Sequence, residues 1–244
     1  MRRVTTLALI TGGTLAVVTA GAFARGRLGG RGPEAPLPDE DAFFTAYAPG
    51  GQYALWANGP IGWVMAKLNP ILEAGVHQGV AEMLDPQPDD ELLDIGCGPG
   101  VFLATKARHV RRVVGLDASR TMLREAERRL ADRLAAGTAR LVTGSAAVLP
   151  FADGEFTAVT VIFAPLKPDE AYRVLRPGGR LVFADSDPRR SSKEPASAWG
   201  RRRYGEADYR RMFEDAGFTD VTFRYRGGRL GGELLGSCRK PAAS

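Results

Sequence analysis

Short apolar runs and segments of helical periodicity alternate along the chain from residue 91 onward. The apolar positions of 119–134 recur every three or four residues and predict an amphipathic helix with Ser119 as its N-cap. Residues 206–217 predict another helix, closed by Gly217. Strands are predicted at 91–97, 112–118, 139–145, 156–164 and 179–186, and a closing hairpin at 221–226 and 233–240. This alternation predicts βαβ units, and therefore an α/β fold with a mostly parallel sheet covered on both faces.

The chain before residue 91 follows other patterns. Residues 4–24 carry no charge, and as one helix they would span roughly 32 Å, close to the ~30 Å hydrocarbon core of a bilayer. The next segment is rich in Gly, Pro and charge, which is typical of a linker. An aromatic-rich segment follows, with helices predicted near 61–68 and 70–84. The expected parts are an anchor or signal-like segment at 1–24, a linker at 25–40, a helical cap at 41–90 and a core at 91–240.

Three interpretations of the N-terminal run stay open: a single-pass anchor, a cleaved signal peptide, and an extension from a misassigned start codon. Residues 22–24 (AFA) fit a cleavage site, although the apolar region is longer than the usual ~7–15 residues. Arginines flank both ends, so charge favours a cytoplasmic C-terminal side only weakly.

Composition narrows the chemistry. The net charge of +5, from 33 Lys+Arg and 28 Asp+Glu, permits an anionic partner without demanding nucleic acid, and no nucleic-acid partner is expected. Two distant cysteines, Cys97 and Cys238, form no metal-binding or disulfide pattern. Two histidines exclude a His-rich metal site, so no metal is expected.

The stretch "LLDIGCGPG" (92–100) places three glycines directly after the first core strand. Glycine permits a sharp turn and close approach of a ligand, although a plain tight turn is the alternative. The spacing differs from the dinucleotide fingerprint G-x-G-x-x-G, and Asp94 would repel a pyrophosphate but suit an amino group. Asp117 ends the second strand, where a carboxylate can accept both hydroxyls of a ribose or instead cap the following helix. These residues predict a nucleoside ligand with a positively charged, non-phosphate tail.

Four motifs in this order resemble the class I S-adenosylmethionine-dependent methyltransferases: "LLDIGCGPG", "VVGLDAS", "LVTGSAAVLPFADGEFTAVTVIF" and "RVLRPGGRLVFAD". The resemblance covers about residues 80–238. It implies a Rossmann-like, doubly wound, seven-stranded sheet with the last strand antiparallel, here preceded by an N-terminal hydrophobic helix. It also implies S-adenosyl-L-methionine as cofactor.

The resemblance further implies the residues that contact the cofactor. Asp94 and the glycine turn would surround the methionine moiety, Asp117 the ribose, and Ala118 and Met122 the adenine. Ser145 stands where many members carry an acidic residue, which removes a charge-assisted contribution of about 1 kcal/mol to cofactor binding. The implied cofactor-binding residues are Asp94, Gly96, Cys97, Gly98, Gly100, Asp117, Ala118, Met122, Ser145 and Ala146.

Catalytic residues are not identifiable from the sequence, because methyl transfer from an activated donor needs mainly positioning of the acceptor. Asp185, Asp187 and His77 are weak candidates whose ordinary alternatives are solvated or packed side chains. His109 is expected at the opposite edge of the sheet. Aromatic residues that could cover the pocket or simply pack are Tyr47, Tyr53, Trp56 and Trp63. The crossover "PLKPDEAY" is short and should leave the pocket open on that side.

The sequence therefore predicts a methyltransferase for a small-molecule or lipid-like acceptor. The alternative is a non-catalytic, cofactor-binding, membrane-associated protein. Ser145 and the short crossover support this alternative. Because the methyl donor is cytosolic, we expect a membrane protein with a single N-terminal span and a cytoplasmic domain, with a cytoplasmic protein as the alternative.

Overall fold

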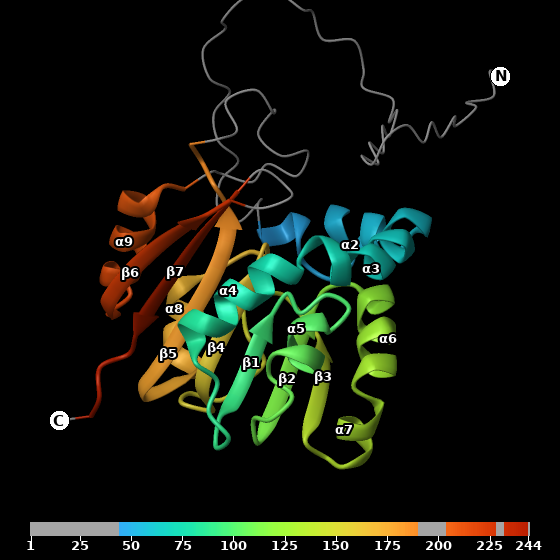
Figure 1. Ribbon diagram of the computed structural model, residues 1–244, viewed down its shortest axis with the longest axis horizontal. Helices are drawn as coiled ribbons and strands as arrows, with labels where there is room; N and C mark the ends of the chain where they lie inside the picture. The colour runs from blue at the N-terminus through green and yellow to red at the C-terminus, as the bar shows by residue number, and fades with distance from the viewer. Residues whose placement is uncertain (1–43, 190–203, 228–231, 244) are drawn as a thin grey trace, which may run out of the picture. The chain divides into compact units, whose positions relative to one another are not determined.

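A seven-stranded sheet organises the computed structural model, which describes residues 44–189, 204–227 and 232–243 (Figure 1). Its strand order is β3-β2-β1-β4-β5-β7-β6. The five strands from β3 to β5 are parallel, and β7 is antiparallel to both β5 and β6. The strands are β1 (Glu91–Ile95), β2 (Arg112–Asp117), β3 (Ala139–Thr143), β4 (Phe156–Ile162), β5 (Leu175–Ser186), β6 (Thr219–Arg226) and β7 (Glu233–Arg239). The predicted seven-stranded sheet with an antiparallel last strand is confirmed.

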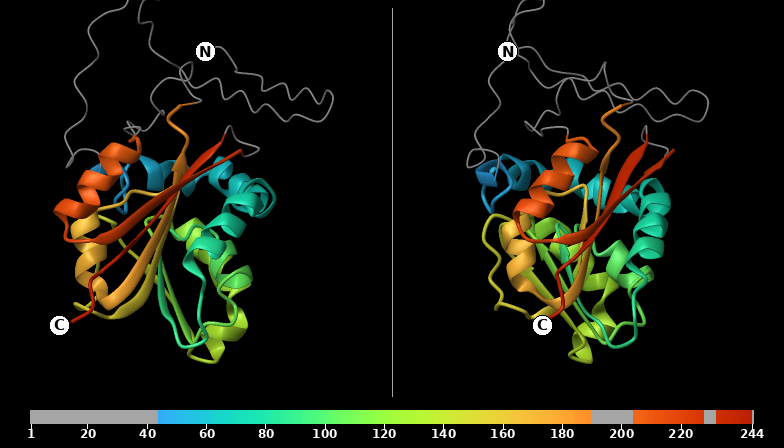
Figure 2. Two further views of the ribbon diagram at one scale, coloured as in Figure 1. Left: turned by 60° about the vertical axis from the view of Figure 1, so that its left-hand side comes forward. Right: turned by 90° about the vertical axis from the view of Figure 1, so that its left-hand side faces the viewer.

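Alternating residues of the central strands fill a core on each face of the sheet. Leu92 of β1 packs in one cluster with helices α4 (Ala74–Leu84), α5 (Val101–Thr105) and α6 (Arg120–Arg129). Leu93 packs in the other cluster with α8 (Pro168–Val174) and α9 (Glu206–Asp215). Figure 2 shows these two helical layers on opposite sides of the sheet. Strand order reverses between β1 and β4, so the turn after β1 opens at the edge where such sheets bind ligands.

Several element boundaries differ from the sequence prediction. The helix predicted at 119–134 divides at Leu130 into α6 and α7 (Ala131–Ala135), and Ser119 caps α6 by accepting a hydrogen bond from the Met122 amide at 3.2 Å. The expected break at Pro70 is absent, because α3 (Pro60–Leu72) continues to Leu72. Strand β5 starts early, since Leu175 already pairs with Phe156 before the chain bulges. The short crossover forms α8.

The expected cap contains a short helix α2 (Gln52–Ala57) followed by α3 and α4. The expected anchor or signal segment (1–24) and linker (25–40) lie outside the described residues. Within the described part of the chain, no helix is long and apolar enough to cross a membrane.

Candidate functional site

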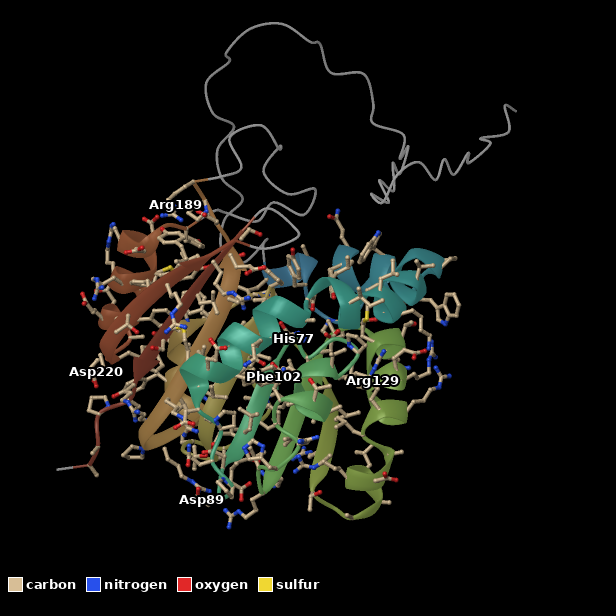
Figure 3. All side chains as sticks on the ribbon, viewed as in Figure 1. His77, Asp89, Phe102, Arg129, Arg189 and Asp220 are labelled. Atoms are coloured by element: carbon tan, nitrogen blue, oxygen red, sulfur yellow. The ribbon has the colours of Figure 1, made fainter. Side chains whose placement is uncertain are left out.

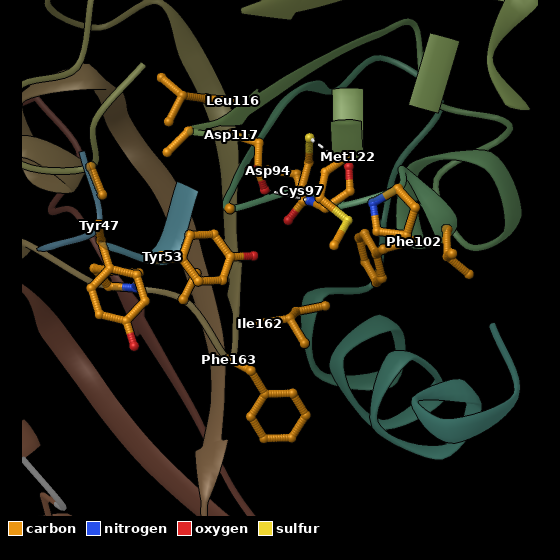
Figure 4. A pocket seen from close by; sticks show the side chains of 18 of the residues that line it. Tyr47, Tyr53, Asp94, Cys97, Phe102, Leu116, Asp117, Met122, Ile162 and Phe163 are labelled. Atoms are coloured by element: carbon orange, nitrogen blue, oxygen red, sulfur yellow. Dashed lines mark hydrogen bonds between the residues drawn. The ribbon is translucent and has the colours of Figure 1, made fainter. Parts of the chain in front are cut away.

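One pocket opens at the carboxyl ends of β1, β2 and β4. It gathers eight of the ten residues predicted to bind the cofactor, and Gly100 and Ser145 are not among its lining residues. Figure 4 shows how the turn after β1 and the end of β2 meet residues of the cap around it. The eight are Asp94, Gly96, Cys97, Gly98, Asp117, Ala118, Met122 and Ala146.

The three glycines of the turn have different physical requirements. All have positive φ, at 72° for Gly96, 51° for Gly98 and 74° for Gly100. A Cβ on Gly96 would lie 2.2 Å from the Ala164 Cβ, and one on Gly100 would lie 2.9 Å from the Ala126 Cβ, so packing excludes side chains at both. A Cβ on Gly98 would meet nothing within 4 Å. Gly98 is therefore the glycine whose open side faces space that a ligand can fill.

Asp117 is held rigidly at the end of β2. One carboxylate oxygen accepts a hydrogen bond from the Ser119 amide at 2.7 Å, and the other accepts from the Gly98 amide at 2.9 Å. The capping alternative therefore holds in part, while the same side chain also joins β2 to the glycine turn. Burial raises the pKa of Asp117 to about 6, although these backbone donors favour its charged form.

Asp94 is the most perturbed carboxyl group of the pocket. It is 2% exposed and accepts a hydrogen bond from the Thr160 hydroxyl of β4 at 2.8 Å. Burial raises its pKa to about 7, and the negative charges of Asp117 and Glu73 raise it further, against the effect of Thr160. No Lys or Arg is among the described residues that line the pocket with it.

The turn after β3 differs from the expectation in its register. The Ser145 hydroxyl accepts a hydrogen bond from the Ala147 amide at 3.1 Å, and the neighbours Gly144 and Ala146 line the pocket instead. The sequence placed Ser145 by analogy with an acidic residue, and a local side-chain-to-backbone bond of this kind is not visible in a motif. The role of Ser145 toward the adenine stays a prediction.

Cys97 lines the pocket and also packs tightly. It is 7% exposed, and a Cβ on Gly115 of β2 would lie 2.7 Å from its sulfur. Burial raises the pKa of its thiol well above the usual value. Both the cofactor contact and the packing expected for Cys97 are compatible with this position.

The cap supplies residues that no core motif identifies. Figure 4 shows the ring of Tyr53 between Tyr47 and the turn that carries Asp94 and Cys97. The rings of Tyr47 and Tyr53 stack with centroids 5.2 Å apart, and both line the pocket. Burial, followed by the charge of Asp117, raises the pKa of Tyr53 well above its ordinary value. Trp56 and Trp63, named with them from sequence, do not line the pocket.

Two polar side chains hold this cap on the core. The Asn58 side-chain oxygen accepts hydrogen bonds from the Ser119 hydroxyl at 2.9 Å and the Thr121 amide at 3.0 Å. Arg129 donates to the carbonyl oxygens of Pro99 in the glycine turn at 2.8 Å and of Ala66 in α3 at 3.2 Å. The cap and the turn are therefore one connected unit.

His77 of α4 lies in the pocket, although its sequence position suggested an ordinary helix residue. It is 5% exposed, and its ring meets the edge of Phe102 with centroids 5.9 Å apart (Figure 3). Its Nε2 lies 3.5 Å from a carboxylate oxygen of Glu73, which also lines the pocket. Its Nδ1 is buried and has no hydrogen-bond partner among the described residues. Buried polar atoms normally have a hydrogen-bond partner, so this nitrogen is suited to a partner from a bound ligand.

The other candidate residues lie elsewhere. Asp185 accepts a hydrogen bond from the Tyr209 hydroxyl at 2.7 Å, and Asp187 pairs with Arg189 at 3.0 Å; neither aspartate lines the pocket. His109 lies 2.8 Å from the Pro86 carbonyl oxygen before β1, at the far end of the sheet. On the side of the crossover the pocket is bounded by 162–165, a wall the sequence did not predict.

Comparisons with known proteins identify relatives of the chain. A family model described as a methyltransferase domain matches residues 92–179. A demethylmenaquinone methyltransferase from Lactiplantibacillus plantarum is 30% identical over 199 residues, which cover 65% of this chain and 84% of that protein. A ubiquinone/menaquinone biosynthesis C-methyltransferase from Ruegeria sp. is 34% identical over 132 residues, which cover 48% of this chain and 52% of that protein. The chain spans only about a third to a half of the length of the first curated relatives it matches.

Solved structures share the fold. Geranyl diphosphate C-methyltransferase from Streptomyces coelicolor matches with a TM-score of 0.58 at 19% identity, over 69% of this chain and 79% of that chain. That likeness shows the fold alone. The family is shown by the relative that is 30% identical and of which the chain covers 84%, and the family model matches the motif region. The chain belongs to the class I S-adenosylmethionine-dependent methyltransferases.

Proposed function

We propose that this protein binds S-adenosyl-L-methionine and transfers its methyl group to a small, largely apolar acceptor. The observation that carries the proposal is an uncompensated negative charge in the pocket. Asp94, Asp117 and Glu73 all line it, while no lysine or arginine is among the described residues of its lining. Buried carboxylates without a protein cation favour a ligand that brings positive charge and hydrogen-bond donors.

The residues present fit this cofactor. The open side of Gly98 admits a ligand against the backbone, Asp94 suits an ammonium group, and Asp117 suits the two hydroxyls of a ribose. Ala118, Met122 and Ala146 are apolar and suit a purine ring. When bound, the cofactor supplies a methyl group activated on a sulfonium, so that the protein's own task is to orient the acceptor and exclude water.

The acceptor class follows from the remaining wall. Phe102, Ile162, Phe163 and Pro165 are apolar, and Tyr47 adds an aromatic face with a polar tip. Such a wall suits a ring or a lipid-like chain better than a highly charged metabolite. The names of the quinone-methylating relatives support an acceptor of this kind.

An acceptor that loses a proton during methylation needs a group to receive it. His77 is the described side chain best suited to this task, because its buried Nδ1 has no hydrogen-bond partner in the part of the chain that the structure describes and Glu73 lies beside its Nε2. We assign to His77 the receipt of that proton at Nδ1, with Glu73 orienting the ring.

Calorimetry with S-adenosylhomocysteine and transfer of a labelled methyl group to a panel of quinols and phenols test the proposal. We expect binding by the full chain and labelling of at least one acceptor. Absence of binding would overturn the whole proposal, while binding without transfer across broad acceptor panels would favour the non-catalytic alternative.

We also propose that residues 4–24 anchor the chain in a membrane with the domain on the cytoplasmic side. Their length and lack of charge support this. Fractionation, N-terminal sequencing and protease protection on inverted vesicles test it. A mature protein that begins at Arg25 outside the cytoplasm would refute it.

A further inference from the structure

Helix α3 buries small residues and exposes large apolar ones, which is the reverse of an ordinary surface helix. It turns Gly62 and Ala66 toward the protein, where both are buried. It turns Trp63, Val64 and Ile71 outward, with exposed fractions of 53%, 44% and 61%. Surface helices of globular proteins normally bury their large apolar side chains and expose polar ones. This arrangement therefore indicates a face that another apolar phase covers.

Helix α2, which contacts α3, also exposes a large apolar side chain, because Leu55 is 68% exposed. We call Leu55, Trp63, Val64 and Ile71 the α3 face. They are four of the five large apolar side chains that are exposed among the described residues, and the fifth, Val148, lies in the turn after β3. Single exposed apolar residues are common, whereas a cluster on one pair of helices marks an interaction surface.

The charged side chains on the elements around the α3 face are mostly cations, although α6 also carries Glu125 and the exposed Glu127. Residues 52–72 contain no Asp or Glu and one cation, Lys67, whose Nζ lies 5.9 Å from the Trp63 ring centroid. On the neighbouring helix α6, Glu125 is buried and pairs with both Lys67 and Arg128. Arg120 and Arg124 of α6 are exposed beside it. A tryptophan with adjacent cations around an apolar patch is typical of residues at a membrane interface.

We propose that the α3 face docks onto the surface of an anionic lipid bilayer. The four side chains present far less area than the ~800 Å² per partner that a stable dimer needs, so a second copy of the chain is the weaker occupant. They suffice for shallow insertion, in which apolar burial and attraction between cations and anionic headgroups add together. The docking does not depend on the proposed methyl transfer.

The α3 face and the pocket share the same cap. Ala57 of α2 and Ala66 of α3 pack on Met122, and Met122 lines the pocket. Figure 1 shows α2 and α3 together at the end of the domain where the pocket opens, next to the start of α6. Docking would hold the cap of the pocket at the lipid surface. If the proposed function is right, a lipid-like acceptor would then enter from the bilayer without crossing water.

Tryptophan fluorescence distinguishes docking of the α3 face from anchoring by residues 4–24, because a chain with a single tryptophan reports the contact of that one residue with lipid. The full chain with Trp56→Phe and Trp199→Phe keeps Trp63, and a matched chain with Trp63→Phe and Trp199→Phe keeps Trp56. Both are mixed with vesicles of phosphatidylcholine and phosphatidylglycerol that carry brominated acyl chains. We expect loss of roughly half of the Trp63 emission, with a blue shift, and much weaker quenching of Trp56.

Val64→Ser with Ile71→Ser, made in the chain that keeps Trp63, should abolish most of the quenching. Val148→Ser is the control, since it removes a valine outside the α3 face that is even more exposed, at 72%, and it should leave the quenching unchanged. Vesicles of phosphatidylcholine alone should quench Trp63 several-fold less. Unquenched Trp63 in anionic vesicles would overturn the proposal, and so would a dimer in solution that the Val64→Ser and Ile71→Ser pair dissociates.

Calorimetry with S-adenosylhomocysteine on each variant keeps the two proposals apart. Intact binding with no Trp63 quenching would overturn the docking alone. Quenching without binding would overturn the proposed function alone. Intact binding also shows that the serine variants are folded.

Discussion

Ligand binding in the pocket should release about one proton at pH 6.5. With pKa values of about 7 and 6, about three quarters of Asp94 and about one quarter of Asp117 carry a proton at that pH in the free protein. A ligand that presents an ammonium group to Asp94 and hydroxyl donors to Asp117 favours both ionised forms and expels those protons. Affinity must then rise with pH through this window.

The size of the effect follows from the same two groups. If the ligand binds only the doubly ionised pocket, affinity at pH 5.5 is roughly 60-fold weaker than at pH 7.0. Below pH 7 the α-amino group of S-adenosylhomocysteine stays charged, so the change reports the protein. Asp94→Asn should remove about three quarters of the released proton at pH 6.5, because Asp94 holds that share of the pair's protons.

Calorimetry of S-adenosylhomocysteine binding in two buffers of different ionisation enthalpy measures the proton release directly. The wild-type chain and Asp94→Asn are compared at pH 6.5, together with affinities at pH 5.5 and 7.0. A proton release near zero, a release that Asp94→Asn leaves unchanged, or an affinity that does not vary with pH would refute the assignment of the two carboxylates to a cationic ligand.

Three further predictions concern stability and turnover. Asp94→Asn should stabilise the ligand-free chain at pH 8 by roughly 1–3 kcal/mol in urea denaturation. Because the pKa of Asp94 is raised in the folded state, the folded state loses stability as pH rises from about 4 to about 7. No gain at pH 8, or the same gain at pH 4, would contradict this. Gly100→Ala should lower the free energy of unfolding by roughly 2–4 kcal/mol because the new methyl group meets Ala126. Gly98→Ala should lower it by only about 1 kcal/mol, yet weaken S-adenosylhomocysteine binding at least tenfold. Equal destabilisation by the two substitutions would show that the two glycines do not differ as described. His77→Gln should slow transfer to a proton-losing acceptor about 100-fold while the dissociation constant of S-adenosylhomocysteine changes less than about threefold; loss of both together would assign His77 to ligand binding or packing.

The sheet and the two buried carboxylates were predictable because their signals are local. Asp94 and Asp117 each end a strand that a short apolar run identifies, and the parallel pairing of β1 with β2 brings the two strand ends together. The difference between Gly98 and Gly100 was not predictable. It depends on Ala126 of α6, which lies against Gly100 only after the fold has formed.

The cap side of the pocket was not predictable for a related reason. His77 lies on a helix whose sequence is typical of ordinary packing. Its proposed role depends on its contacts with Phe102 and Glu73. Asn58 fixes the cap through the N-terminus of α6, more than 60 residues away in sequence. Long-range polar contacts of this kind leave no periodic trace in a sequence.

The small residues of the cap explain both its fit to the pocket and its apolar exterior. A Cβ on Gly62 would lie 2.0 Å from the Ala57 carbonyl oxygen, so α3 approaches α2 as closely as only glycine allows. Ala57 and Ala66 pack on Met122, which lines the pocket. On α3, Gly62 and Ala66 take positions that face the protein, and Trp63, Val64 and Ile71 lie on its exposed side. Exposure of these side chains to water costs free energy, and an apolar phase outside the protein is the contact that would remove this cost.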